Sequence, residues 1–149
     1  MTTSTCPRTG TELDEILSAP RDATIAALER VPGDIVVLGA GGKMGPTLAR
    51  MARRAAGTGL RVIAVSRFGS PATERALLDA GVETIKCDLL DRNAVALLPD
   101  APNVVYMAGQ KFGTTGTPSR TWMMNVVVPA ICAERYAESR IVAFSTGNV

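Results

Sequence analysis

The sequence predicts a doubly wound α/β fold, in which a parallel five-stranded sheet is covered by helices on both faces. Short, almost continuous apolar runs recur along the chain, as expected for strands that are buried on both sides. Segments with helical spacing separate these runs, which is the pattern of βαβ units. The chain has 149 residues, enough for one domain with its own hydrophobic core.

Residues 1–33 are expected to form a helical extension in front of the sheet. Pro20 suits the first turn of the second helix of this extension, and Pro32-Gly33 ends it. The first helix has a threonine cap and three apolar residues that share one face. The cap and these apolar residues are Thr11, Leu13, Ile16 and Leu17.

Residues 34–149 alternate between strands and helices, and right-handed crossovers favour the strand order 3-2-1-4-5. The expected strands are Asp34–Leu38, Arg61–Ser66, Val82–Cys87, Asn103–Met107 and Arg140–Ser145. The expected helices are Pro46–Ala56, a helix from Ser70-Pro71 to Ala80, a short helix from Asp91 to Leu98, and a long helix from Thr117-Pro118 to about Glu138.

Composition excludes several classes of function. Sixteen basic against fourteen acidic residues give a net charge of +2, so no nucleic-acid partner is expected. The absence of histidine excludes Ser-His-Asp hydrolysis and histidine-ligated metals within this sequence, and no metal site is expected. The longest apolar run, within residues 122–133, is too short to span a membrane. Cys6, Cys87 and Cys132 are far apart, which favours a reduced, cytoplasmic location.

A glycine-rich turn, Gly39-Ala-Gly-Gly42-Lys43-Met44-Gly45, follows the first expected strand. Gly39 permits a tight turn, Gly42 leaves room for a pyrophosphate against bare backbone, and Gly45 lets the helix approach the strand. The helix N-terminus and Lys43 add positive potential. The turn therefore predicts a phosphate site, with a glycine turn that binds no ligand as the alternative. Its spacing lacks the lysine-hydroxyl pair of a P-loop NTPase.

Five short motifs follow one another between residues 34 and 149. They are Gly39-Ala-Gly-Gly-Lys-Met-Gly45, Cys87-Asp88-Leu89, Met107-Ala-Gly-Gln-Lys111, Asn125-Val-Val-Val-Pro129 and Phe144-Ser-Thr-Gly-Asn-Val149. In this order and spacing the chain resembles the NAD(P)-dependent epimerase/dehydratase family of the extended short-chain dehydrogenases/reductases. The resemblance implies a Rossmann domain with an NAD(P) cofactor.

The resemblance also implies roles for residues after the third and fourth strands. Asp88 would accept a hydrogen bond from the adenine amine and Leu89 would form an apolar wall, although Asp88 could instead be a loop acid or a helix cap. Lys111 would lie near the diphosphate or a substrate phosphate, or be an ordinary loop lysine. The residues implied to pass under the ribose and diphosphate are Met107, Ala108 and Gly109.

Two residues are candidates for catalysis by the same resemblance. Thr146 aligns with the catalytic Ser/Thr of the family, where its hydroxyl would bond the substrate oxygen; a strand-end hydroxyl that caps a turn is the alternative. Pro129 has no N–H, so the carbonyl of Asn125 loses its helical partner and can hold a water of a proton relay. The alternative for Asn125 is a kinked helix in which it bonds a neighbouring loop.

The end of the second expected strand indicates which cofactor is preferred. NAD-binding members usually have an acid there, which accepts hydrogen bonds from the ribose. Here Ser66 stands in that place and Arg67 follows, and an arginine can bind a 2′-phosphate. We therefore predict NADP in preference to NAD. The alternative is that Arg67 pairs with a local acid such as Glu74.

The family's Tyr-x-x-x-Lys does not occur in this sequence, because neither Tyr106 nor Tyr136 has a lysine four residues later. In family enzymes this pair supplies the acid–base group, and it normally follows the Ser/Thr. The sequence therefore resembles the N-terminal part of a longer enzyme, and residues 1–149 alone are expected to bind cofactor with negligible turnover.

Two functions remain open at this point. The first is an oxidoreductase or isomerase acting on a sugar, a nucleotide-sugar or a similar hydroxy/keto compound. The second is a non-catalytic NAD(P)-binding sensor or regulatory module. A third hypothesis, a scaffold that binds no cofactor, has less support from the residues. The resemblance implies a homodimer through the helix after the fourth strand. We also expect Ile141–Phe144 to form an apolar sheet edge that limits solubility or pairs with another copy.

Overall fold

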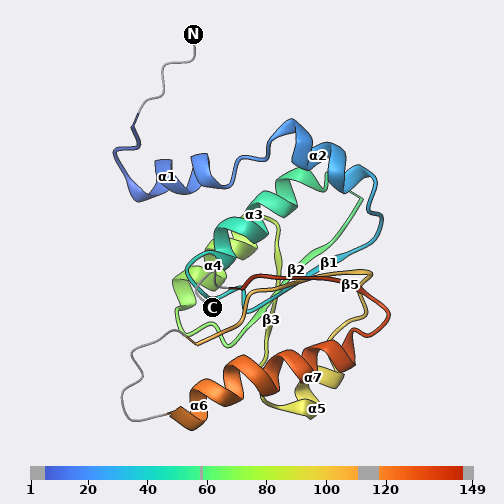
Figure 1. Cartoon of the computed structure of the whole chain (residues 1–149). Coiled ribbons are helices and arrows are strands. Elements are labelled where there is room, and N and C mark those ends of the chain that lie inside the picture. The colour runs from blue at the N-terminus through green and yellow to red at the C-terminus, as the bar shows by residue number, and fades with distance from the viewer. Residues whose placement is uncertain (1–5, 58, 111–117, 146–149) are drawn as a thin grey trace.

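A parallel sheet of five strands lies between two layers of helices in the computed structural model, which describes residues 6–57, 59–110 and 118–145 (Figure 1). The strands are β1 (Ile35–Leu38), β2 (Val62–Ser66), β3 (Glu83–Lys86), β4 (Asn103–Tyr106) and β5 (Arg140–Ala143). Their order is β3-β2-β1-β4-β5 and every neighbouring pair is parallel. The predicted fold class and strand order are therefore confirmed.

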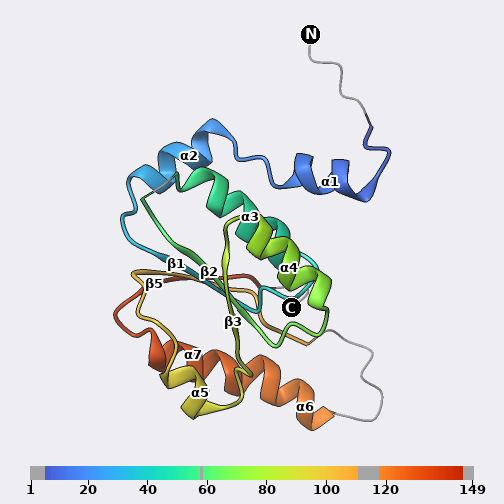
Figure 2. The ribbon, with the colours of Figure 1, turned by 180° about the vertical axis from the view of Figure 1, so that it is seen from behind.

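The helices divide between the two faces of the sheet, as Figure 2 also shows from behind. On one side lie α1 (Gly10–Leu17), α2 (Asp22–Glu29), α3 (Gly45–Ala55) and α4 (Pro71–Asp79). On the other side lie α5 (Arg92–Ala96), α6 (Pro118–Trp122), a π-helical turn η1 (Met123–Val127) and α7 (Val128–Arg135). None of the helices in the described ranges is both long and apolar enough to cross a membrane.

Two hydrophobic clusters, one on each face, explain why the first strand is apolar throughout. Successive side chains of a strand point to opposite faces. Ile35 and Val37 of β1 pack in the cluster under α3 and α4, whereas Val36 and Leu38 pack in the cluster that includes residues of α5 and α7. All four side chains are buried, so a polar residue at any of these positions would lack a hydrogen-bond partner.

Side-chain caps fix two of the helix starts that the sequence predicts. The Ser70 side chain accepts a hydrogen bond from the Thr73 N–H (3.4 Å) at the start of α4. At the start of α5, Asp91 accepts from the N–H groups of Asn93 (2.9 Å) and Ala94 (3.1 Å). Such caps satisfy N–H groups that have no partner inside the helix.

The N-terminal extension differs from the prediction in where its helices begin. Thr9, not Thr11, caps α1, and its hydroxyl accepts from the Glu12 N–H (3.1 Å). The second helix begins at Asp22 after Arg21, so Pro20 precedes the helix instead of opening it. Capping geometry can be satisfied at either threonine, and the sequence alone did not distinguish them.

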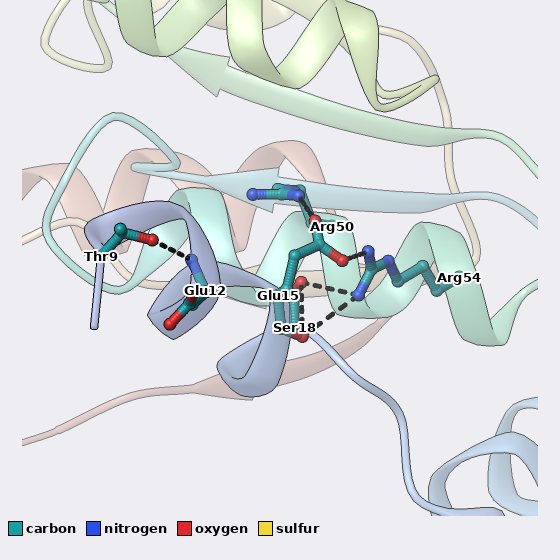
Figure 3. A network of polar contacts seen from close by, with 6 residues as sticks. All are labelled: Thr9, Glu12, Glu15, Ser18, Arg50 and Arg54. Atoms are coloured by element: carbon teal, nitrogen blue, oxygen red, sulfur yellow. Dashed lines mark hydrogen bonds and ion pairs between the residues drawn. The ribbon is translucent and has the colours of Figure 1, made fainter. Parts of the chain in front are cut away.

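Helix α1 docks on α3 through charged and polar side chains. Glu15 bonds Arg50 and Arg54 of α3, and Arg54 also donates to the Ser18 hydroxyl (3.0 Å), as Figure 3 shows. These arginines hold the pKa of Glu15 below its usual value. The apolar residues Leu13, Ile16 and Leu17 remain exposed. Helix α1 thus docks on α3 through charge pairing, while its own apolar residues stay exposed.

The long helix after β4 is interrupted and shorter than expected. The Val128 N–H bonds the Met123 carbonyl five residues earlier, which is π-helical geometry, and α7 ends at Arg135 instead of near Glu138. Pro129 has no N–H and its ring collides with a carbonyl four residues earlier, so a regular α-helical turn cannot run through it. The wider turn accommodates the proline.

Candidate functional site

A cleft of about 490 Å³ opens at the carboxyl ends of the strands. β1 is flanked by β2 on one side and β4 on the other, so the chain leaves the sheet in opposite directions around this point. In open α/β sheets such a switch point is where ligands bind. The cleft is lined by Gly39, Gly41, Gly42, Ser66, Arg67, Phe68, Gly69, Cys87, Asp88, Leu89, Met107, Ala108, Gly109 and Met124.

Three glycines of the turn after β1 have different surroundings. Gly39 has a positive φ of 86°, and a Cβ there would lie 2.5 Å from the Ala108 nitrogen at the end of β4. A Cβ on Gly45 would lie 2.3 Å from the Ala40 carbonyl oxygen, so this glycine lets α3 pack against the turn. A Cβ on Gly42 would meet only the Gly39 oxygen, at 3.5 Å. The backbone at Gly42 therefore faces open space in the cleft.

The N-terminus of α3 has no side-chain cap. Met44 is the N-cap and makes no side-chain hydrogen bond to the helix, and no acidic residue lies in the first turn. Gly42 lines the cleft just before this helix start, whereas the exposed side chains of Lys43 and Met44 are not part of the lining. The uncapped N-terminus of α3 suits an anion through its N–H groups and dipole.

The end of β2 forms the next wall of the cleft. The Ser66 hydroxyl lies 2.5 Å from the position of a Cβ on Gly41, so the serine packs against the glycine turn. Arg67 is exposed and lines the cleft. Glu74, the acid considered as its partner, pairs instead with Lys86 at 2.8 Å. Within the described residues Arg67 forms no ion pair, so its charge is available to a ligand.

The segment after β3 contributes a carboxylate and an apolar wall. Asp88 is exposed and one of its oxygens accepts from the Leu90 N–H (3.1 Å). Asp91, and not Asp88, caps the following helix, so the helix-cap alternative for Asp88 is wrong. Leu89 is buried at the cleft wall. Cys87 also lines the cleft, and burial raises the pKa of its thiol, which keeps it protonated and unreactive.

Asn125 holds the segment that follows β4. Its side-chain oxygen accepts from the Gln110 N–H (2.8 Å) and its amide nitrogen donates to the Gln110 oxygen (3.1 Å). The same oxygen lies 3.4 Å from the position of a Cβ on Gly109. The loop-bonding alternative for Asn125 is therefore what its side chain does. The role of its backbone carbonyl in a water relay stays a prediction.

The structure brings together most of the residues that the sequence singled out for the cofactor. Gly45 is buried behind the turn, and Lys43 and Met44 lie outside the lining. Lys111 and Thr146 lie outside the described residues. Among the described residues no group of three or more cysteine, aspartate or glutamate side chains could hold a metal ion. Five lining residues were not predicted, namely Gly41, Phe68, Gly69, Cys87 and Met124.

Comparison with known proteins identifies the family of this chain. The family model described as the NAD dependent epimerase/dehydratase family matches residues 35–149. The chain belongs to this family. The matched region runs from β1 through the glycine turn and β5, so it includes every residue of the cleft. No curated protein sequence gave a significant match.

Several solved structures have a similar fold. The Helicobacter pylori ADP-L-glycero-D-manno-heptose-6-epimerase covers 87% of this chain and 42% of its own at 16% identity, with a TM-score of 0.68. The Campylobacter jejuni UDP-Glc/GlcNAc 4-epimerase covers 76% of this chain and 37% of its own at 17% identity, with a TM-score of 0.61. The Bordetella bronchiseptica enzyme WbmF, solved with NAD⁺ and UDP, covers 78% of this chain and 39% of its own at 17% identity, with a TM-score of 0.55. This family member therefore spans about two fifths of the length of these proteins.

Both tyrosines of this family member lie in the core. Tyr136 donates from its hydroxyl to the Pro99 carbonyl (3.1 Å), and burial raises its pKa to about 12. Tyr106 is buried between β1 and β5, and burial raises its pKa well above the usual value for a phenol. Neither side chain lines the cleft, so neither can serve as its acid–base group.

Proposed function

We propose that this chain is the dinucleotide-binding part of an epimerase/dehydratase-type enzyme, and that it prefers NADP to NAD. The single observation that carries the proposal is the cleft itself. It combines a glycine turn, an uncapped helix start and an arginine without an ion pair among the described residues, all at the switch point of the sheet. This combination supports binding of a ligand with phosphates at both ends of an adenosine.

The residues of the cleft fit a dinucleotide in its extended form. Gly42 and the N-terminus of α3 would hold the pyrophosphate, because a Cβ at Gly42 would occupy open cleft. Ser66 and Arg67 would hold the adenosine ribose and its 2′-phosphate, since a guanidinium binds phosphate with two hydrogen bonds. Asp88 and Leu89 would flank the adenine. The residues that would pass beneath the ribose and diphosphate are Met107, Ala108 and Gly109.

The reaction proposed for the whole enzyme is hydride transfer on a sugar, a nucleotide-sugar or a similar hydroxy/keto compound. The bound nicotinamide supplies a hydride acceptor or donor. Thr146 would donate a hydrogen bond to the substrate oxygen, and Asn125 would hold a relay water through its carbonyl. The sugar-nucleotide epimerases among the similar structures support this substrate class. Residues 1–149 would bind cofactor with negligible turnover, because no Tyr-x-x-x-Lys is present.

A non-catalytic NAD(P)-binding module is the second candidate. The burial of both tyrosines is compatible with it, because neither of them can supply an acid–base group from within residues 1–149. The two candidates differ in what a longer polypeptide does. An enzyme that contains residues 1–149 would turn over an added sugar or nucleotide-sugar and change the absorbance of NADP(H), whereas a sensor would bind the cofactor without turnover.

Calorimetric titration tests the cofactor proposal. We expect NADP⁺ to bind about tenfold or more tightly than NAD⁺, because the extra phosphate forms charge-assisted bonds with Arg67. Arg67→Ala should abolish this preference. Arg75→Ala is the matched control, since Arg75 is an exposed arginine on α4 that pairs with Asp79 and does not line the cleft. Tighter binding of NAD⁺ by the unmodified chain would contradict the predicted preference, and no binding of either would refute the function.

A further inference from the structure

Phe68 combines burial with a backbone conformation that aromatic residues avoid. Its φ is +44°, and it is the one non-glycine residue with a positive φ in the described ranges. For a bulky L-residue this conformation is strained. Phe68 is 6% exposed and packs in the cluster under α3 and α4. A glycine, which adopts a positive φ without strain, stands at the next position, Gly69, and yet the positive φ is at Phe68.

Ser66 and Phe68, the two neighbours of Arg67 in the chain, both pack against the glycine turn. The Ser66 hydroxyl packs against Gly41 and accepts a long hydrogen bond from the Phe68 N–H (3.5 Å). An atom of the Phe68 ring lies 3.8 Å from the position of a Cβ on Gly41. Arg67 therefore sits between two neighbours that are both fixed on the glycine turn. Its backbone is restrained on each side, while its own side chain is exposed in the cleft.

The restrained backbone is the main influence on where the Arg67 side chain points. No acidic residue in the described part of the chain pairs with Arg67, and Glu74 forms its ion pair with Lys86 instead. An arginine without a protein partner has many rotamers, and ordering it on a ligand costs conformational entropy. A fixed backbone limits where the guanidinium can reach, so less ordering remains when a ligand binds.

We propose that Phe68 is a positioning residue that fixes Arg67 at the cleft and thereby sets the preference for a 2′-phosphorylated adenosine. The left-handed turn at Phe68 directs the chain so that Arg67 lines the cleft. Burial of the ring prevents the strain from relaxing, because any relaxation would pull the ring out of the core. This inference rests on the proposed function, since it requires Arg67 to hold the 2′-phosphate.

A purely structural role for Phe68 makes a different prediction. If the ring only fills the core, its loss destabilises the protein and weakens every ligand of the cleft to the same extent. If the ring positions Arg67, its loss weakens the ligand that carries the 2′-phosphate more than the ligand that lacks it. The ratio of two affinities therefore separates the two roles, whereas either affinity alone does not.

The test uses adenosine 2′,5′-bisphosphate and 5′-AMP, titrated calorimetrically into the unmodified chain and into Phe68→Gly, Phe68→Leu and Arg67→Ala. We expect the unmodified chain to bind the bisphosphate about tenfold more tightly than AMP. Arg67→Ala should remove this ratio. Phe68→Gly should lower this ratio about threefold or more. Phe68→Leu keeps a buried anchor and should retain the ratio.

Each contrary outcome identifies which step fails. An unchanged ratio in Phe68→Gly, with only a lower melting temperature, overturns the positioning role and leaves the proposed function intact. An unchanged ratio in Arg67→Ala overturns the assignment of the 2′-phosphate, and failure of the unmodified chain to bind either probe overturns the cofactor site. If Phe68→Gly does not fold, Phe68→Ala is measured in its place, and a ratio equal to that of Phe68→Leu overturns the inference.

Discussion

At the scale of single residues, some glycines of the turn after β1 are required by packing, and another is available for ligand binding. Gly39 and Gly45 are surrounded by backbone, with the Ala108 nitrogen and the Ala40 oxygen where a Cβ would stand. Gly42 lines the cleft and is less crowded, because a Cβ there would meet only the Gly39 oxygen, at 3.5 Å. Adding one carbon at these positions therefore tests two different properties of the protein.

Gly42→Ala should leave the fold intact and impair binding. The new Cβ meets only an oxygen at 3.5 Å, an ordinary contact, so the free energy of unfolding should change by less than about 1 kcal/mol. We expect NADP⁺ affinity to fall about tenfold or more because the methyl group occupies the pyrophosphate position. Gly45→Ala is the contrasting variant and should lose more than about 2 kcal/mol. Urea unfolding and calorimetry measure both; undiminished binding by Gly42→Ala would place the pyrophosphate elsewhere.

Tyr136 makes a prediction about pH. Tyr136→Phe removes the bond to Pro99 and should lower the free energy of unfolding by about 1 kcal/mol at pH 7. The folded pKa of about 12 lies above the unfolded value of about 10. The stabilisation from the neutral phenol is therefore complete below about pH 10 and is lost as the pH rises toward 12.

The difference between the unmodified chain and Tyr136→Phe should accordingly shrink above about pH 10, because only the unmodified chain loses this contribution. Urea unfolding at several pH values measures the difference. Tyrosinate absorbance in the same titration should rise together with unfolding. A gap that stays constant up to pH 12, or a phenol that ionises in the folded protein near its ordinary pKa, would contradict the burial of this side chain.

At the scale of elements, local patterns predicted the strands and several helix starts but not the geometry near Pro129. The apolar run of β1 and the caps at Ser70 and Asp91 are short-range features, and the structure has them as expected. The π turn precedes Pro129 and includes Asn125, whose side-chain oxygen accepts a tertiary hydrogen bond from the Gln110 N–H. The sequence indicated a break at this helix but not its form.

The cleft shows the same division between local and tertiary information. Motifs adjacent to strand ends identified Gly42, Arg67 and Asp88, because the carboxyl ends of parallel strands meet at one edge. Phe68 and Met124 also line the cleft, and each packs in the hydrophobic cluster of a different face of the sheet. No local sequence pattern specifies this packing. The docking of α1 could not be predicted for a similar reason, because Glu15 pairs with Arg50 and Arg54, which lie 35 and 39 residues later in the chain.

The pair formed by Asn125 and Gln110 gives a prediction at this scale. Asn125→Leu keeps the side-chain size but removes both hydrogen bonds, so the backbone after Gly109 should lose its fixed position. We expect NADP⁺ affinity to fall about fivefold. Asn93→Leu is the matched control, an asparagine on α5 outside the cleft lining. Equal NADP⁺ affinities of the two variants in calorimetry would show that the hydrogen bonds between Asn125 and Gln110 do not support the cofactor site.

At the scale of the whole molecule, two exposed apolar surfaces lie in the described part of the chain that follows β4. The first lies on α6 and η1 and comprises Trp122, Met123, Val126 and Val127. The second is the edge strand β5, where Ile141 and Val142 are exposed and Phe144 follows. The predicted apolar edge is therefore present. Contiguous apolar surface of this kind is typical of contact with another polypeptide.

We predict a homodimer that uses the α6–η1 surface. The unmodified chain should sediment at twice its 15.6 kDa mass. Val126→Glu places a charge on that surface and should give a monomer, because a buried unpaired charge costs more than about 3 kcal/mol. Val142→Lys places a charge on β5 instead and should leave the dimer intact while it raises solubility, since a lysine blocks edge pairing.

Trp122 provides an independent signal for the same equilibrium. It is the single tryptophan of the chain and is 69% exposed in one copy. Dimerisation through α6–η1 should bury it, so its emission should shift to longer wavelength on dilution and in Val126→Glu, but not in Val142→Lys. If Val142→Lys were the variant that dissociates, the edge strand would be the interface. A monomer at all concentrations would refute both surfaces as self-association sites and leave them free for other polypeptides.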